Sequence, residues 1–221
     1  MAYRNYSGAW LPETNQAGVR YVKGTWADET LRGSDGPDEF EGGGGWDTFV
    51  GGGGDDFYWL RDGRHPVQEW AGGGVDTVKV WGSHTLAANV ENLIVFGHDS
   101  YAAGNELNNI IRGEDGAQFI YGGRGEDVLI GGGGADTFVV VTGEGHKVIQ
   151  DFEAGWGGGD KLRLVGSTLT SFEAVKGAMT QAGADVVLNS GGTNILFRNM
   201  TVDRFAADDF QLPINLSLIH I

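Results

Sequence analysis

The chain has 221 residues, of which 40% are apolar and 11% aromatic, so it can bury a core and is neither a charged tail nor a coiled coil. Its formal net charge of −15 disfavours nucleic acid and anionic membranes as partners, since both would repel it at long range. No cysteine is present, so no disulfide can cross-link the fold, and the 40 glycines would by number alone favour a disordered linker.

A nine-residue phrase of the type Gly-Gly-x-Gly-x-Asp-x-apolar-x occupies 33–41, 42–50 and 51–59 without a gap and returns at 122–130 and 131–139. Glycines let the backbone adopt positive φ and turn its carbonyl oxygens inward. The aspartate adds a hard anionic oxygen, completing the flexible shell of about six to eight oxygens that calcium prefers. Because an apolar residue follows two positions after the aspartate in all five phrases, the linker interpretation is disfavoured.

The residues after each aspartate predict a short strand whose middle side chain points inward, because strand side chains alternate between faces. These inward residues are Phe40, Phe49, Tyr58, Leu129 and Phe138. Degenerate phrases extend both runs, with Glu29 at the sixth position of 24–32, Asn109 in 104–112 and Gln118 in 113–121. A partial phrase at 71–79 offers Asp76 but is out of register with the first block.

The phrase resembles the repeats-in-toxin (RTX) family of hemolysin-type calcium-binding proteins. The resemblance implies an all-β fold: a parallel β-roll, or right-handed β-helix of Gly-Gly-x-Gly-x-Asp nonapeptides, in which two phrases make one coil. Turns two phrases apart then stack one strand spacing, roughly 4.8 Å, from each other. The predicted stacked pairs are Asp38 with Asp56, Glu29 with Asp47, Asn109 with Asp127, and Gln118 with Asp136.

The expected ligands of Ca²⁺ lie in these turns. In the first block they are Gly33, Asp35, Gly36, Asp38, Gly42, Gly44, Gly45, Asp47, Gly51, Gly53, Gly54 and Asp56. In the second block they are Asn109, Gly122, Arg124, Gly125, Asp127, Gly131, Gly133, Gly134 and Asp136. Only Asp38 with Asp56 is a clean double-aspartate pair, so the first block is expected to bind more tightly, because affinity rises with ligand charge.

The predicted segments are a lead-in (1–23), a first repeat block (24–59), connecting coils (60–103), a second repeat block (104–139) and a capping region (140–215). In the connecting coils, Val90, Leu93 and Val95 are expected to line the interior. Asp151 and Asp160 either complete the last half-sites above Asp127 and Asp136 or are ordinary turn aspartates.

The capping region is predicted to contain one short helix and one hairpin. Thr-Ser-Phe-Glu at 170–173 reads as a capping box, after which Phe172, Val175 and Met179 would share one helix face. The segments 186–188 and 195–197 flank a glycine-containing turn and predict the hairpin. Together they are expected to cover the open end of the roll, which would otherwise expose unpaired strand edges.

The first ten residues lack the apolar core of a secretory signal, and no stretch is long enough to span a bilayer. The resemblance implies an extracellular protein exported by a type I secretion machinery, with an uncleaved C-terminal signal and folding on contact with outside calcium. The final segment, 216–221, is what the sequencing-adapter sequence CTG TCT CTT ATA CAC ATC would encode, and we interpret it as an artefact.

Metal binding and folding are expected to be one coupled event. Stacked aspartates roughly 5 Å apart repel by about 3 kcal/mol at an effective dielectric constant of about 20, and glycine adds an entropic cost of about 0.5–1 kcal/mol per residue relative to alanine. The metal-free repeats are therefore predicted to be largely unfolded.

No catalytic motif of the His-Glu-x-x-His or Gly-x-Ser-x-Gly type occurs, and the five histidines are scattered, so the chain is expected not to be an enzyme. Two alternatives to a pure calcium-binding module stay open. One is a calcium-dependent glycan-binding module in which an exposed Trp46 stacks on an acidic or neutral polysaccharide. The other is the non-catalytic C-terminal part of a secreted polysaccharide-modifying enzyme, protease or lipase.

Overall fold

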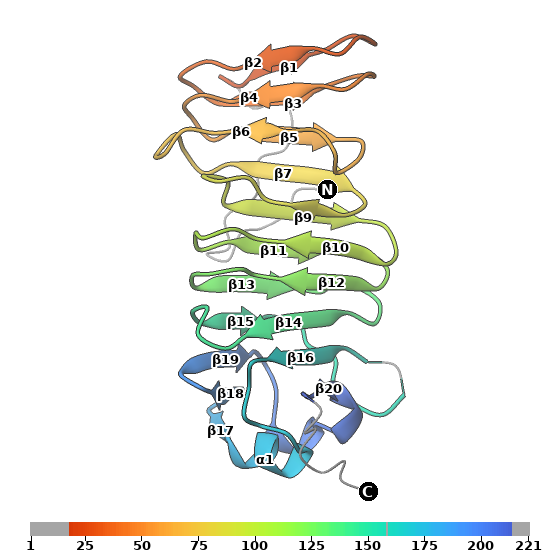
Figure 1. The fold of residues 1–221 in the computed structure, drawn as a ribbon, viewed down its shortest axis with the longest axis vertical. Coiled ribbons are helices and arrows are strands. Elements are labelled where there is room, and N and C mark those ends of the chain that lie inside the picture. The colour runs from red at the N-terminus through yellow and green to blue at the C-terminus, as the bar shows by residue number, and fades with distance from the viewer. Residues whose placement is uncertain (1–17, 158, 214–221) are drawn as a thin grey trace, which may run out of the picture.

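The computed structural model describes residues 18–157 and 159–213. Within these ranges the chain winds into a parallel β-roll, with strands β1 and β2 at one end and helix α1 at the other (Figure 1). The predicted all-β class is confirmed. The predictions for the start of the lead-in and for 216–221 lie outside the described residues.

Consecutive strands of the roll alternate between two faces (Figure 1). One face is a single sheet of eleven strands, in the order β1 (Arg20–Lys23), β3 (Asp38–Glu41), β5 (Phe57–Leu60), β7 (Thr77–Trp81), β9 (Asn92–Phe96), β11 (Ile110–Gly113), β13 (Asp127–Ile130), β15 (Lys147–Ile149), β19 (Thr193–Phe197), β18 (Asp185–Ser190) and β17 (Met179–Ala182). The other face is formed by two shorter sheets. They are β2 (Thr30–Arg32), β4 (Thr48–Val50) and β6 (Val67–Gln68), and then β8 (His84–Thr85), β10 (Ser100–Ala103), β12 (Gln118–Tyr121), β14 (Thr137–Val141), β16 (Lys161–Val165) and β20 (Phe210–Gln211).

The strand register confirms that two phrases make one coil. Phe40 pairs with Tyr58 across β3 and β5, and Ile111 pairs with Leu129 across β11 and β13, each 18 residues apart. Between β5 and β7 the partners Tyr58 and Val78 are 20 residues apart. The phrase at 71–79 is two residues out of register in the sequence, but it is in register in the structure. The turn before β7 absorbs the two extra residues.

The core is one column of apolar side chains between the two faces. The five predicted inward residues, Phe40, Phe49, Tyr58, Leu129 and Phe138, are at most 1% exposed. Burial of each such side chain contributes about 1.5–3 kcal/mol. The expected interior residues of the connecting coils, Val90, Leu93 and Val95, are buried as well.

The capping region contains the predicted helix and hairpin. Helix α1 (Phe172–Gly177) begins after Ser171, whose hydroxyl accepts a hydrogen bond from the Ala174 N–H at 3.1 Å. The capping box predicted at 170–173 is therefore wrong by one residue, because Ser171 and not Thr170 is the N-cap. The prediction that Met179 continues this helix is wrong, because the chain leaves the helix at Ala178 and Met179 pairs with Leu188 in β17.

The hairpin of β18 and β19 turns at Gly191 and Gly192, which both have positive φ. Its strand β19 pairs in parallel with β15, and β20 pairs with β16, so both faces of the roll are covered at this end. Two short 3₁₀ turns, η1 (Val202–Arg204) and η2 (Ala207–Asp209), precede β20. Among the described residues, no helix is long and apolar enough to cross a membrane.

Candidate metal-binding turns

The sixth-position side chains of the phrases stack along the larger sheet in what we term the first row: Asp38, Asp56, Asp76, Asn109 and Asp127. The Asp38 N–H donates to Asp56 Oδ1 at 2.8 Å, and the Asp56 N–H donates to Asp76 Oδ1 at 2.8 Å. Further along, the Asn109 N–H donates to Asp127 Oδ1 at 2.8 Å. Each of these carboxylates thus accepts a hydrogen bond from the preceding turn.

A second row lies on the opposite face and contains Glu29, Asp47, Gln118, Asp136 and Asp160. The Glu29 N–H donates to Asp47 Oδ1 at 3.1 Å, the Gln118 N–H to Asp136 Oδ1 at 2.8 Å, and the Asp136 N–H to Asp160 Oδ1 at 2.9 Å. All four predicted stacked pairs are therefore in contact.

The structure distinguishes the two aspartates whose roles the sequence leaves open. Asp160 stacks on Asp136, as one interpretation requires. Asp151 does not stack on Asp127, because its carboxylate accepts the N–H groups of Gly131 and Gly132, each at 2.9 Å. The place beside Asp127 belongs to Lys147, which pairs with it in register.

Fifth-position side chains accept hydrogen bonds from the following turn, whereas sixth-position side chains accept them from the preceding turn. Asp28 Oδ1 accepts the N–H of Trp46 in the following turn at 2.6 Å, and Asn108 Oδ1 accepts the N–H of Glu126 at 2.8 Å. Asp55 Oδ1 does the same for Val75 at 2.8 Å. Each turn is thereby tied to its neighbours by side-chain oxygens.

The remaining carboxylate oxygens of the rows have the chemistry that a cation requires. Among the described residues, the Oδ2 atoms of Asp47, Asp56, Asp76 and Asp136 are buried and have no hydrogen-bond partner. Since burying an ionised carboxylate without a partner is costly, such atoms call for a bound ion or water. Their chemistry, a hard anionic oxygen, fits calcium.

Glycine is required where the oxygens converge. A Cβ built on Gly33 would lie 2.0 Å from the Gly51 carbonyl oxygen and 2.7 Å from Asp38 Oδ2. A Cβ on Gly131 would lie 2.4 Å from Asp136 Oδ2. The first glycine of a phrase therefore leaves open a small space bounded by carbonyl and carboxylate oxygens.

The other predicted ligands lie in the same turns. The predicted glycines all lie in the connections between strands. Asp35 and Arg124 are exposed, and the Arg124 guanidinium lies 3.8 Å from Glu106, so their backbone carbonyls are the relevant oxygens. The ligand assignment of these residues stays a prediction.

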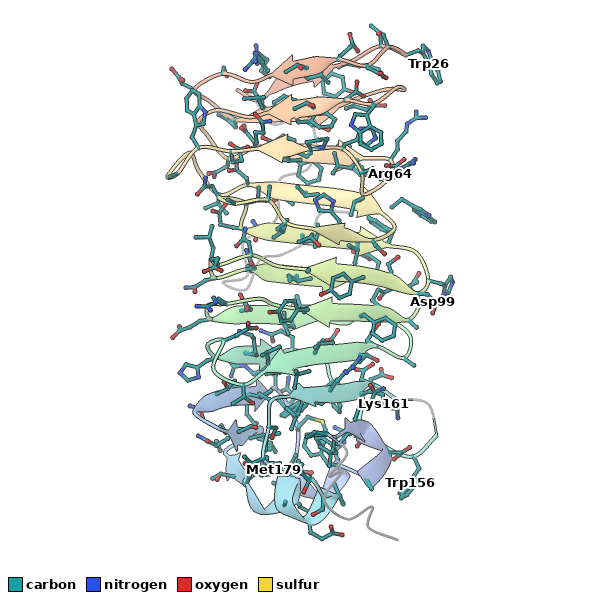
Figure 2. The ribbon with its side chains drawn as sticks, in the orientation of Figure 1. Trp26, Arg64, Asp99, Trp156, Lys161 and Met179 are labelled. Carbon is teal, nitrogen blue, oxygen red and sulfur yellow. The ribbon has the colours of Figure 1, made fainter. Side chains whose placement is uncertain are left out.

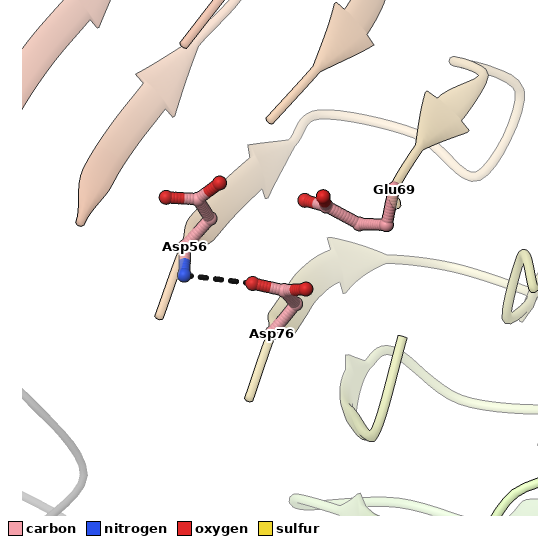
Figure 3. A group of neighbouring side chains, drawn as sticks. All are labelled: Asp56, Glu69 and Asp76. Atoms are coloured by element: carbon pink, nitrogen blue, oxygen red, sulfur yellow. Dashed lines mark hydrogen bonds between the residues drawn. The ribbon is translucent and has the colours of Figure 1, made fainter. Parts of the chain in front are cut away.

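Sequence reasoning missed one member of the densest acidic cluster. Asp56, Glu69 and Asp76 can each place one carboxylate oxygen within 4.8 Å of the others (Figure 3). Glu69 also accepts a short hydrogen bond from the Tyr58 hydroxyl and one from the Gly52 N–H. Glu69 follows β6 in a connecting segment, where no repeat pattern marks it.

The turns are electrostatically unfavourable without a cation. Burial, reinforced by neighbouring carboxylates, raises the pKa of Asp56 to about 7 and that of Asp76 to about 8. In the second row, burial raises the pKa of Asp136 to about 7, with Asp160 and Asp151 adding repulsion. A divalent cation among these groups would favour their ionised forms and offset this cost.

A comparison with known protein families identifies the same two repeat blocks. The model of the RTX calcium-binding nonapeptide repeat matches residues 23–58 and 103–138. A crystal structure of the extracellular lipase LipA from Serratia marcescens aligns with 90% of this chain and 41% of its own, at 18% sequence identity and a TM-score of 0.44.

Two curated relatives come from Rhizobium meliloti (strain 1021). The endo-1,3-1,4-beta-glycanase ExsH is 42% identical over 75% of this chain, and the endo-1,3-1,4-beta-glycanase EglC is 35% identical over the same share. The matched region is 35% of each relative, so the chain spans about a third of the length of these proteins.

These relatives contradict the prediction that the chain is not an enzyme, because both are named as glycanases. The prediction relied on missing histidine and serine motifs. Glycoside hydrolysis needs only two suitably spaced carboxyl groups, which such motifs do not reveal. The absence of those motifs therefore says little about this class of enzyme.

Proposed function

The chain carries RTX calcium-binding nonapeptide repeats, and on that premise we propose that it binds calcium in its glycine turns and that binding drives the roll to fold outside the cell. The observation that carries the proposal is the set of buried, unpartnered Oδ2 atoms in both rows. Millimolar extracellular calcium matches the affinity of about 10⁻⁴–10⁻³ M common in extracellular modules.

The proposed ligands are the sixth-position carboxylates and amides, other than Asp127, whose Oδ2 lies 2.9 Å from the Lys147 ammonium, together with the carbonyl oxygens of the turn glycines predicted from the sequence. Glu69 and Asp76 join them beside Asp56. Calcium would supply positive charge that neutralises crowded carboxylates, so the energy of binding becomes energy of folding.

The test compares Asp56→Asn with a matched control, Asp99→Asn. Asp99 is exposed at the edge of the roll (Figure 2), and its φ of 56° is one that asparagine tolerates. Calcium binding is measured by isothermal titration calorimetry, and folding by circular dichroism with and without a chelator. We expect the wild type and Asp99→Asn to gain β-structure on adding calcium, and Asp56→Asn to need roughly tenfold more calcium. A circular dichroism spectrum of the wild type that a chelator leaves unchanged would contradict the proposal.

We further propose that the chain is the calcium-binding roll of a longer, secreted polysaccharide-degrading enzyme that leaves the cell by a type I machinery. The support is its similarity to two glycanases of which it spans about a third. Expression of the complete gene product should give a protein that hydrolyses a mixed-linkage β-glucan and loses that activity in chelator. A complete product with no activity on any β-glucan would count against this assignment.

A specific groove favours glycan binding as a second function. On the outer face of β1, β3, β5, β7 and β9 a groove of about 650 Å³ is lined by the aromatic side chains of Tyr21, Trp59, Trp81 and Phe96. The Trp81 and Phe96 rings are parallel within 3°, with centroids 6.1 Å apart. Aromatic rings exposed in this way offer flat apolar faces on which a sugar ring can stack.

The charges of the groove favour a neutral glycan. Two carboxylates, Glu39 and Glu41, are balanced by Arg61 and Lys79 along the same lining. Trp46, the residue singled out from the sequence, is 51% exposed but lies away from this groove, with the Arg64 guanidinium 5.7 Å from its ring centroid. The groove is therefore the better candidate surface.

Binding of a soluble mixed-linkage β-glucan in calcium buffer tests the groove. We expect Trp81→Ala to weaken binding about tenfold, equivalent to about 1.4 kcal/mol. Trp156→Ala is the control, since Trp156 is 81% exposed and lies near the opposite end of the roll (Figure 2). Equal binding by both variants, or no binding by the wild type, would exclude the groove.

A further inference from the structure

The last turn of the first row contains a lysine at the place of an aspartate. Lys147 pairs in register with Asp127 across β13 and β15, and it is 1% exposed. Its ammonium nitrogen Nζ donates to the carbonyl oxygens of Gly125 at 3.0 Å and Glu144 at 2.8 Å. The same nitrogen lies 2.9 Å from Asp127 Oδ2.

This set of oxygens is the kind that the other turns offer to a cation. It combines a carboxylate Oδ2 with backbone carbonyls from two successive turns, 122–127 and 142–147. A lysine ammonium has three N–H donors, and three oxygens surround it here. Because a buried charge is costly unless it is paired, this complete set of partners explains how Lys147 is tolerated inside the roll.

We propose that Lys147 is a built-in cation that replaces calcium between the turns 122–127 and 142–147. The proposal rests on the proposed function, in which the other turns bind calcium. The space between the turns 122–127 and 142–147 is then filled by the lysine ammonium without a metal ion. The capping region therefore stays joined to the second repeat block when calcium is removed.

The second row provides an internal comparison at the same end of the roll. There the last pair is Asp136 with Asp160, and Asp136 Oδ2 has no hydrogen-bond partner among the described residues. Asp127 Oδ2 has none either, but it lies 2.9 Å from the Lys147 Nζ. The lysine that follows Asp160 in the chain, Lys161, does not take the corresponding place, because its Nζ lies 3.7 Å from Asp208 Oδ2 instead. One row thus ends in an ion pair and the other in an orphaned carboxylate oxygen.

The opposite end of the first row repeats the arrangement in weaker form. Arg20 Nε lies 2.6 Å from Asp38 Oδ1, and Arg20 Nη2 donates to the Arg32 carbonyl at 2.7 Å. The Arg20 side chain is half exposed, whereas that of Lys147 is fully buried. A basic residue therefore stands at each end of the first row, and the buried one is the stronger candidate for replacing an ion.

Two variants and a control test the proposal by calcium calorimetry and by thermal unfolding in calcium. Lys147→Asp restores the acidic sixth position and should bind one more calcium ion per chain than the wild type. Lys147→Met leaves Asp127 unpaired and should lower the melting temperature in calcium by roughly 10 °C. Lys161→Met, at a partly exposed lysine, should change neither quantity. An unchanged stoichiometry in a folded Lys147→Asp variant would overturn the proposal.

Crystals of the wild type grown with calcium give a readout that does not depend on variants. We expect anomalous difference peaks beside Asp56 and Asp136 and none within bonding distance of Asp127 Oδ2. A peak at Asp127 with the lysine displaced would refute the role of Lys147 and leave the proposed function intact. Absence of calcium from every turn would refute both.

Discussion

A single methyl group at the first glycine of a phrase would fill the space where the turn oxygens converge. A Cβ at Gly33 would meet the Gly51 carbonyl, which is backbone and cannot move aside alone, whereas a Cβ at Gly36 would have no atom within 4 Å. We expect Gly33→Ala to weaken calcium binding about tenfold or more, and Gly36→Ala to leave it unchanged. Calorimetry of the two variants side by side checks this, and equal affinities would contradict it.

Residue spacing predicted which sixth-position side chains meet, because a nine-residue phrase and a two-phrase coil determine the neighbours of Asp38 and Asp136. The same logic could not find Glu69, since it reaches the cluster from a connection without a periodic pattern. It also could not place the Lys147 ammonium. The sequence shows a lysine at the sixth position of 142–150, but a flexible four-carbon side chain has many directions open to it until packing selects one.

At the scale of elements, β7 shows how far a repeat pattern can be trusted. The phrase before it is displaced by two residues in the sequence, yet Asp76 continues the first row because the turn takes up the difference. The helix shows the opposite limit. Its start was predictable to within one residue, since the capping-box pattern places the cap at Thr170 whereas Ser171 caps the helix. Its end at Ala178 depends on the pairing of β17 with β18, a tertiary contact.

The capping elements should prevent the roll from associating with another chain through this end. A chain ending at residue 165 would lack β19 and β20 and would leave the edges of β15 and β16 unpaired. Unpaired parallel edges are templates for association with another chain. We therefore expect this truncated chain to form oligomers in calcium, as measured by size-exclusion chromatography with light scattering. A truncated chain that remains a folded monomer would show that β19 and β20 are dispensable for this purpose.

For the whole molecule, stability without calcium should fall as the pH rises. The folded-state pKa values of Asp56, Asp76 and Asp136 are raised to about 7, 8 and 7, against about 3.9 for an aspartate in an unfolded chain. Their contribution to stability is therefore fully present below about pH 4 and is lost as the pH rises through 7 to 8.

Circular dichroism of the chelated protein between pH 5 and pH 8 measures this effect. We expect more β-structure, and a higher midpoint of urea unfolding, at pH 5 than at pH 8. Calcium should remove or reverse the difference, because it binds the ionised carboxylates. A chelated protein whose unfolding midpoint is the same at both pH values would contradict the electrostatic account of the turns.

The hydrogen bonds between side-chain oxygens and the amides of neighbouring turns affect how the protein unfolds locally. Sixth-position carboxylates accept N–H groups from the turn before, and fifth-position side chains accept them from the turn after. Amide hydrogens in loops ordinarily exchange quickly with solvent, because nothing but water holds them. Here the amides of Asp56 and Glu126 each donate a hydrogen bond of 2.8 Å to a side-chain oxygen of a neighbouring turn. Hydrogen exchange should then proceed by unwinding from the two ends of the roll. The turn amides in the middle of the roll should be the last to exchange with deuterium.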